Sequence, residues 1–248
     1  RIEGRGSQGL TPPSNILNVG NSGTTIRLLT GILATQSFES ALTGDESLTS
    51  RPMERVITPL TKMGAHITAH NGRAPLTVPG GPLHAIDYIP DIPSAQVKSA
   101  ILFAGLQAKG TTTIRERAIT RDHSELALEA FGAFIERSNN MSAHNVTNLQ
   151  GIENTDTTYR VAITGDQRLV AQSLNVPGDL SSAGFLAAAA AALPGSELEL
   201  IDVGLNPTRT ALINVLRRMG VSIEISEQKV LLGERRGNMV IRHNELHP

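Results

Sequence analysis

A run of small, hydrogen-bonding residues stands directly before an apolar, helical stretch near the start of the chain. It reads Asn21-Ser22-Gly23-Thr24-Thr25-Ile26-Arg27. Ser22 can cap the helix, Gly23 allows close approach to the backbone, and the free N–H groups of a first helical turn attract anions. The segment is therefore a candidate anion site. An ordinary helix cap, the usual role of small residues at a helix start, is the alternative.

Arginines stand in or beside three of the predicted helix starts: Arg27, Arg51 and Arg121. A guanidinium group presents a planar fork of donors that suits carboxylate and phosphate oxygens. Arg51 precedes Pro52, a residue that fits the first turn of a helix. A solvated arginine is the plain alternative, but a cation at a helix N-terminus opposes the helix dipole and so needs another reason to be there. We therefore expect these arginines to bind an anion.

A second apolar helix begins at Ser94-Ala95-Gln96. This start supplies a hydroxyl and an amide where the first helix supplies Asn21 and Thr24. Such neutral donors and acceptors suit a hydroxylated, anionic small molecule. Lys98, two positions further on, is expected to face another direction, and we interpret it as structural.

Composition narrows the classes of function. With 248 residues, 40% of them hydrophobic and 18% charged, the chain can bury one large or two smaller cores. Its formal net charge of −1 gives no overall field for nucleic acid or a membrane surface. The longest apolar run, residues 185–193, is shorter than the ~20 residues of a membrane span. No signal-peptide pattern is present, and we expect a cytoplasmic protein.

Thiol and metal chemistry have little support in the sequence. It contains no cysteine, which excludes disulfides, thiolate metal sites and a cysteine nucleophile. Its seven histidines lack metal-ligand spacing, and His66 and His70 lie in a segment predicted as strand and turn. His123 follows Asp122, and we interpret it as the neighbour of a helix-capping aspartate. No metal site is predicted.

Three segments share one layout, which indicates an internal repeat. Each has a serine, an apolar helix, a strand and a second helix that stops at a glycine. The serines are Ser22, Ser94 and Ser181, the strands are residues 38–43, 111–115 and 197–203, and the glycines are Gly64, Gly132 and Gly220. From serine to glycine the separations are 42, 38 and 39 residues. Glycine suits the left-handed conformation that follows a helix.

Apolar residues three and four apart place a stripe on each second helix. The stripes are Met53, Val56, Ile57, Leu60 and Met63; Ala127, Leu128 and Phe131; and Leu212, Val215, Leu216 and Met219. A strand pair is expected after each glycine, such as residues 65–69 with 75–78 and residues 221–225 with 230–232. The middle unit has the longest connection, residues 137–156, which we expect to be a mobile surface loop without chemistry.

Each unit is thus predicted to run strand, helix, strand, helix, strand, strand. The first helix of the third unit contains Phe185, Leu186 and the alanines of residues 187–192. Because it is apolar on nearly every side, neighbours must enclose it. Units that pack helices inward and sheets outward would do so. The predicted fold class is therefore α/β (α+β), built from repeated βαβαββ units.

At these residues the sequence resembles the enolpyruvyl transferases, and among them the members that act on shikimate 3-phosphate. The matching blocks are residues 17–29, 44–48, 51–53, 94–100, 120–125, 177–183 and 206–209. They follow in order along essentially the whole chain. The resemblance implies a two-domain inside-out barrel, incomplete here, that is a monomer at full length.

The resemblance also implies a reaction of aromatic amino acid biosynthesis in the shikimate pathway. The enolpyruvyl group of phosphoenolpyruvate moves to the 5-hydroxyl of shikimate 3-phosphate, releasing phosphate without a cofactor or metal. Phosphoenolpyruvate would contact Asn21, Gly23, Arg51 and Gln96, while shikimate 3-phosphate would contact Ser94, Ala95, Gln96 and Arg121. Thr24, Arg27 and Asp179 would have supporting roles. Glyphosate, a phosphonate, would compete at Arg51.

Other parts of the family pattern have no counterpart in these residues. Family members are longer, and their N-terminal substrate-binding set and their acid, base and further basic groups cannot be matched. The resemblance thus implies the central part of a transferase, with no catalytic residue in this segment and little activity alone. Residues 1–175 would be part of the first domain and residues 176–248 part of the second. Exposed helix faces and sheet edges are then expected.

Three alternatives to this interpretation remain open. UDP-N-acetylglucosamine enolpyruvyl transferase has the same fold and donor but another acceptor, and the blocks at residues 94–96 and 120–125 argue against it. RNA 3′-terminal phosphate cyclases share related units but should present a basic surface that this composition lacks. A non-catalytic binding or structural fragment is the third alternative.

Overall fold

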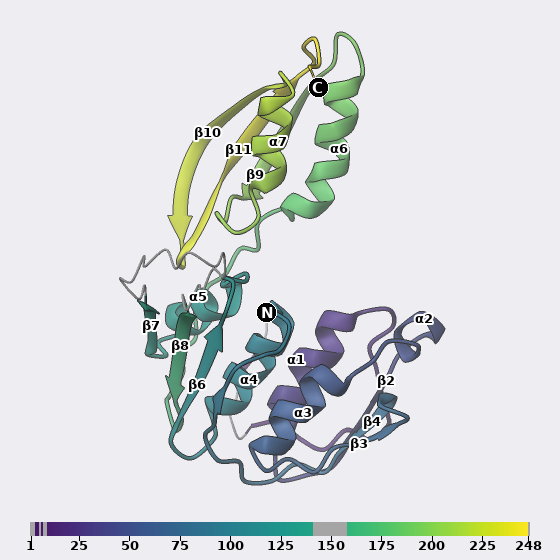
Figure 1. Cartoon of the computed structure of the whole chain (residues 1–248), viewed down its shortest axis with the longest axis vertical. Coiled ribbons are helices and arrows are strands. Elements are labelled where there is room, and N and C mark those ends of the chain that lie inside the picture. The colour runs from purple at the N-terminus through teal and green to yellow at the C-terminus, as the bar shows by residue number, and fades with distance from the viewer. Residues whose placement is uncertain (1–2, 5, 7–8, 141–157, 248) are drawn as a thin grey trace, which may run out of the picture. The chain divides into compact units, whose positions relative to one another are not determined.

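A computed structural model describes residues 3–4, 6, 9–140 and 158–247 of the protein (Figure 1). Contacts divide the chain into two compact units. Unit 1 comprises Arg1–Thr120 and Phe131–Ala171, and unit 2 comprises Arg121–Ala130 and Gln172–Pro248. Within the described residues, unit 1 contains two sheets and unit 2 contains one, each packed with helices.

Two four-stranded sheets of one topology form unit 1 within the described residues. The first has the order β1-β2-β4-β3, from β1 (Leu17–Asn18), β2 (Ser40–Thr43), β3 (Thr68–His70) and β4 (Arg73–Val78). The second has the order β5-β6-β8-β7, from β5 (Asp87–Tyr88), β6 (Thr111–Glu116), β7 (Ile135–Asn140) and β8 (Thr158–Thr164). In each, the first pair is parallel and the others are antiparallel. This shared pairing confirms two of the predicted repeats.

Helices fill the space between these sheets. They are α1 (Gly23–Leu33), α3 (Glu54–Lys62) and α4 (Ala95–Gly105), while the short α2 (Glu46–Thr49) follows β2 and contacts β4. Figure 1 shows α1, α3 and α4 between the two sheets, so the helices face inward as predicted. A Cβ added to Gly31 of α1 would lie 2.2 Å from the carbonyl oxygen of Ala100 in α4. Since that distance excludes any side chain, the two helices touch backbone to backbone.

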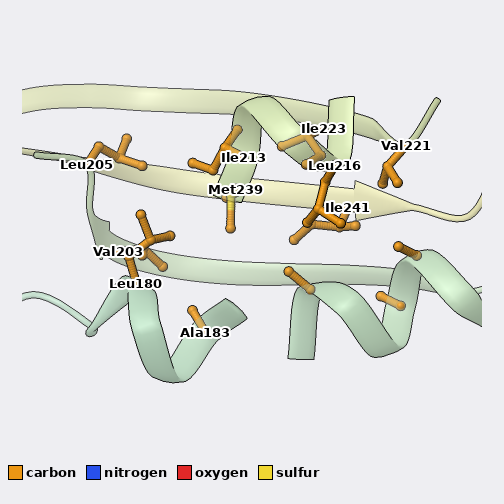
Figure 2. Packing of buried hydrophobic residues seen from close by; sticks show 13 residues of the cluster. Leu180, Ala183, Val203, Leu205, Ile213, Leu216, Val221, Ile223, Met239 and Ile241 are labelled. Carbon is orange, nitrogen blue, oxygen red and sulfur yellow. The ribbon is translucent and has the colours of Figure 1, made fainter. Parts of the chain in front are cut away.

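Unit 2 repeats the pattern with a smaller first strand. It contains α5 (His123–Ala130), α6 (Leu180–Ala192), β9 (Glu197–Gly204), α7 (Ala211–Arg218), β10 (Ser222–Leu231) and β11 (Glu234–Arg242). The sheet order is β10-β11-β9, and a parallel bridge from Gly178 to Val203 occupies the place of the first strand. Figure 2 shows the core, where α6 and α7 pack on the sheet through residues such as Ala183, Ile213, Leu216, Met239 and Ile241.

Local signals predicted the ends of the second helices well. Gly64, Gly132 and Gly220 have φ angles of +101°, +93° and +95°, the left-handed conformation expected after a helix. The whole first stripe, from Met53 to Met63, is buried. In the second stripe Leu128 is buried but Ala127 is exposed.

Two predictions about burial in unit 2 are wrong. On α7, Ile213 and Leu216 are buried, whereas the predicted Leu212 and Val215 are 38% and 47% exposed. On α6, Phe185 is 81% exposed, so the described residues do not enclose this helix. The reason is that each helix packs on the sheet through one narrow face, formed in α6 by small residues. The expectation of exposed helix faces is confirmed.

The position of the last hairpin also differs from the prediction. The strand pair predicted at residues 221–225 and 230–232 leaves residues 226–229 for the turn between them, but β10 continues through these residues to Leu231. A register shift between Ser226 and Lys229 accommodates these residues as an irregularity within the ladder. The chain turns instead at Leu232 and Gly233, whose φ angles are +51° and +81°.

The connection predicted at residues 137–156 is shorter than expected at its start. Residues up to Asn140 belong to β7, and residues 141–156 lie outside the described part of the chain. Among the described residues, no helix combines the length and the apolar character needed to cross a membrane.

Candidate functional site

The first turn of α1 is capped, as the interpretation of this motif as an ordinary helix cap predicts. Ser22 Oγ accepts a hydrogen bond of 3.1 Å from the Thr25 N–H, and the Gly23 N–H donates to the Asn21 carbonyl at 3.0 Å. The Ile26 N–H donates to the Ser22 carbonyl. These donors serve the chain itself, so attraction for an anion depends on side chains as well as on the helix end.

Arg51 is joined to the same turn through Asn21. Its Nη2 donates to Asn21 Oδ1 at 2.6 Å and to Ser47 Oγ at 3.1 Å. The Asn21 amide donates in turn to Asp45 Oδ2 at 2.8 Å. Asp45 also caps α2, and the hydrogen bond from the Leu48 backbone N–H, followed by that from Asn21, lowers the pKa of its carboxyl group. A fixed carboxylate thus orients the Asn21 amide, whose oxygen then faces Arg51.

Arg27 links the starts of α1 and α4. Its Nη1 donates to the Gly23 carbonyl at 3.0 Å and to Gln96 Oε1 at 2.9 Å. Gln96 Nε2 completes the link by donating to Thr24 Oγ1 at 2.7 Å. Residues 69 and 72 positions apart in sequence therefore share one hydrogen-bonded network.

Positive charge is concentrated beside Gly23. A Cβ at this position would lie 2.8 Å from Arg27 Nη1 and 3.1 Å from Arg51 Nη1. Burial, and then the nearby charges of Arg51 and Arg55, lowers the pKa of Arg27. Two guanidinium groups this close repel one another, so an anion that bound both would relieve the repulsion.

Ser94 and Ala95 stand next to Gln96 at the start of α4. Ser94 is the N-cap residue, and its Oγ accepts a long hydrogen bond of 3.4 Å from the Val97 N–H. The Ala95 carbonyl accepts from Ser99 Oγ at 2.7 Å. Both Ser94 and Ala95 are only partly buried, so a ligand can reach this end of the helix.

Two candidates belong to unit 2. Arg121 is exposed and lies two residues before α5. Asp179 caps α6 by accepting hydrogen bonds from the Ser181 and Ser182 N–H groups, and it forms an ion pair of 2.9 Å with Arg209. Unit 1 therefore brings together Asn21, Gly23, Thr24, Arg27, Arg51 and Gln96, with Ser94 and Ala95 adjoining. Arg121 and Asp179 are not part of that network.

Sequence reasoning missed three contributors to the network: Asp45, Ser47 and Arg55. Asp45 and Ser47 lie within a matched block, and Asp45 stands three residues before Leu48, the spacing of a capping aspartate. Arg55 is the second residue of α3, just after the connection that carries Arg51, and its charge contributes to lowering the pKa of Arg27. Within the described part of the chain, no group of three or more His, Cys, Asp or Glu side chains is placed to hold a metal ion.

Comparison with known proteins gives one consistent result. The family model described as EPSP synthase (3-phosphoshikimate 1-carboxyvinyltransferase) matches residues 1–245. The chain is 48% identical over 248 residues to 3-phosphoshikimate 1-carboxyvinyltransferase of Alkaliphilus metalliredigens, covering 99% of this chain and 54% of that protein. It is 47% identical over 247 residues to the protein of that name from Bacillus velezensis, covering 99% and 53%.

A solved structure agrees with these relatives. EPSP synthase from Acinetobacter baumannii superimposes with a TM-score of 0.77 at 39% identity, covering 95% of this chain and 49% of the solved one. The chain therefore spans about half the length of the curated relatives and of the solved structure that it matches.

Proposed function

This chain belongs to the EPSP synthase family, and from that premise we propose the activity of the full-length protein that contains it. It transfers the enolpyruvyl group of phosphoenolpyruvate to the 5-hydroxyl of shikimate 3-phosphate and releases phosphate. The observation that carries the proposal is the network in which Arg27 and Arg51 meet beside Gly23 and extend to Gln96. It supports a site for a small, highly charged donor next to a second ligand.

Phosphoenolpyruvate is proposed to bind at Asn21, Gly23, Arg51 and Gln96. Its phosphate and carboxylate groups suit the paired guanidinium groups, because charge-assisted hydrogen bonds are the strongest that a protein side chain offers. Gly23 leaves room for the ligand, since a side chain there would lie against both arginines. Fixed positive groups would also stabilise charge that builds up as phosphate leaves.

Shikimate 3-phosphate is proposed to bind at Ser94, Ala95, Gln96 and Arg121. The long cap bond of Ser94 supports this role, because a hydroxyl held at 3.4 Å exchanges partners at small cost. Gln96 would then stand between the two substrates, held by Arg27 and hydrogen-bonded to Thr24. Thr24, Arg27 and Asp179 keep supporting roles in this proposal.

Proton transfer is assigned to groups outside these 248 residues. Addition and elimination require a positioned acid and base. The network here consists of arginines, amides, hydroxyls and one carboxylate, Asp45, whose oxygens already accept from Asn21 and the Leu48 N–H. We also propose that residues 1–175 and 176–248 belong to two domains of a monomeric protein. The chain passes from unit 1 to unit 2 between Ala171 and Gln172, and this change close to residue 175 supports the boundary. Residues 121–130, which include α5, differ from the proposed division because they belong to unit 2.

The full-length protein provides the test. Phosphate release is measured with phosphoenolpyruvate and either shikimate 3-phosphate or UDP-N-acetylglucosamine as acceptor. Turnover with shikimate 3-phosphate as the acceptor, and none with UDP-N-acetylglucosamine, supports the proposal. Turnover with the nucleotide sugar, or with neither acceptor, contradicts it. Size-exclusion chromatography with light scattering checks the monomer.

A further inference from the structure

Three polar side chains of unit 1 form a connected set separate from the arginine network. Lys98 Nζ forms an ion pair of 2.9 Å with Glu116 Oε2. Thr120 Oγ1 donates to the other carboxylate oxygen, Glu116 Oε1, at 2.5 Å. Lys98 Nζ also approaches the Thr120 carbonyl oxygen at 3.5 Å. Each of these three residues therefore contacts the other two.

The ion pair lies in the interior of the unit. The side chains of Lys98 and Glu116 are both 0% exposed, and Lys98 Nζ is 5.9 Å from the centre of the Tyr159 ring. Removing two charges from water is costly, and an apolar pair of similar volume often stabilises a protein as well or better. A gain in stability therefore does not explain why this ion pair is present. The ion pair also fixes the positions of its two side chains relative to one another, which a pair of apolar side chains would not do.

The three residues connect three segments of unit 1, one of which is the start of α4, where the acceptor is proposed to bind. Lys98 is the fourth residue of α4, whose start carries Ser94, Ala95 and Gln96. Glu116 is the last residue of β6. Thr120 belongs to the connection between β6 and α5, in which residues 117–119 are exposed.

Thr120 immediately precedes Arg121 in the chain. Its hydroxyl is held by Glu116 and its carbonyl faces Lys98, so both ends of the residue have partners. The carbonyl belongs to the peptide group that leads into Arg121. That peptide group is rigid and planar, so fixing its oxygen fixes the backbone of this connection at Thr120, within unit 1.

We propose that Lys98, Glu116 and Thr120 are positioning residues for the shikimate 3-phosphate subsite. They hold the start of α4, which carries Ser94, Ala95 and Gln96, against the end of β6 and the connection that follows it, all within unit 1. This inference rests on the proposed function and extends it to side chains that do not touch substrate. A small displacement of a substrate-holding group is enough to weaken binding substantially.

Thr120→Val in the full-length protein tests the inference with little change of shape. In valine a methyl group of similar size replaces the hydroxyl that donates to Glu116, and Thr120→Ser keeps that hydroxyl as the matched control. We expect Thr120→Val to raise KM for shikimate 3-phosphate about tenfold, because a small displacement of the groups that hold the substrate weakens its binding. KM for phosphoenolpyruvate should change less than about twofold, and Thr120→Ser should resemble the wild type.

A second variant addresses the ion pair. Lys98→Met together with Glu116→Leu removes both charges, which avoids leaving one buried charge unpaired. It should fold and show the same selective rise in KM for shikimate 3-phosphate. A rise equal for both substrates, or none in either variant while the wild type is active, would overturn the positioning role. A wild-type protein without turnover of shikimate 3-phosphate would overturn the proposed function itself, and this inference with it.

Discussion

Arg27 and Arg51 approach the same point of the backbone, since their Nη1 atoms lie 2.8 Å and 3.1 Å from where a Cβ of Gly23 would stand. Arg27 belongs to α1 and Arg51 to the connection between α2 and α3, and the two reach this point through different partners. Arg51 is held by Asn21, and Arg27 is held by Gln96. This convergence of charge is the basis of the first two predictions.

Arg51→Ala should weaken phosphoenolpyruvate binding in the full-length protein. Losing a charge-assisted contact to an anion costs about 1.5–3 kcal/mol, so KM should rise about 10- to 100-fold. The inhibition constant of glyphosate should rise in parallel if the phosphonate uses the same group. Arg55→Ala is the control, because it removes a nearby charge without removing Arg51. An unchanged KM for Arg51→Ala would refute the assignment.

Anions should stabilise unit 1 by relieving repulsion between the arginines. Ligand at about 100 times its Kd adds about 2.7 kcal/mol to the free energy of unfolding. We therefore expect phosphoenolpyruvate, and more weakly inorganic phosphate, to raise the melting temperature relative to chloride at equal ionic strength. Differential scanning fluorimetry measures the shift. Equal shifts in the wild type and Arg51→Ala would argue against binding at this place.

Gly31→Ala should destabilise unit 1 strongly. Its new Cβ would lie 2.2 Å from the Ala100 carbonyl oxygen, so α1 and α4 must move apart. Overpacking of this kind costs about 1–3 kcal/mol, and backbone on the opposing side gives it little room to relax. Urea unfolding followed by circular dichroism measures the loss. Gly4→Ala, with no heavy atom within 4 Å of the added Cβ, should leave the midpoint unchanged.

Asp202 should contribute stability to unit 2 only above acidic pH. The hydrogen bond from Arg236 lowers the pKa of Asp202, with burial acting in the opposite direction. A carboxyl group with a lowered folded pKa stabilises at pH values above its unfolded pKa of about 4, and the contribution disappears as pH falls through the folded value. Asp202→Asn should therefore be less stable than the wild type at pH 6, and the difference should shrink toward pH 3.

Urea titrations at several pH values check this prediction. Asparagine tolerates the positive φ of +53° at this position, so the substitution removes charge without adding backbone strain. Asp166→Asn is the matched control, because Asp166 also has a positive φ, of +59°. A difference between wild type and Asp202→Asn that stayed constant with pH would show that charge is not the cause.

Local chemistry explains why the repeat could be predicted from sequence. Ser22, Ser94 and the glycines after the second helices act within a few residues of themselves, through caps and left-handed turns. The predicted apolar stripe on α3 is buried because α1 and α4 pack against this helix inside unit 1. The spacing of apolar residues, together with helix caps and glycine turns, is therefore sufficient to predict the order of helices and strands.

The burial of a side chain and its hydrogen-bond partners depend on residues that are distant in the sequence, and these features were not predicted correctly. Leu212 was as apolar as Ile213, and only the sheet decided which of the two was covered. The bond from Asn21 to Asp45 joins residues 24 positions apart, and no local pattern announces it. The polar stretch before Lys229 resembled a turn because an exposed, irregular strand carries the same residue types.

The recurrence of one strand order bears on how such a protein diversified. When a βαβαββ module is copied, the opening of its first helix is copied with it, so new binding positions come with new scaffold. The three openings carry different groups: arginines gather at α1, neutral groups at α4, and an aspartate paired with Arg209 at α6. A repeated module thus offers a set of equivalent locations, each of which can be equipped separately for a different part of a ligand.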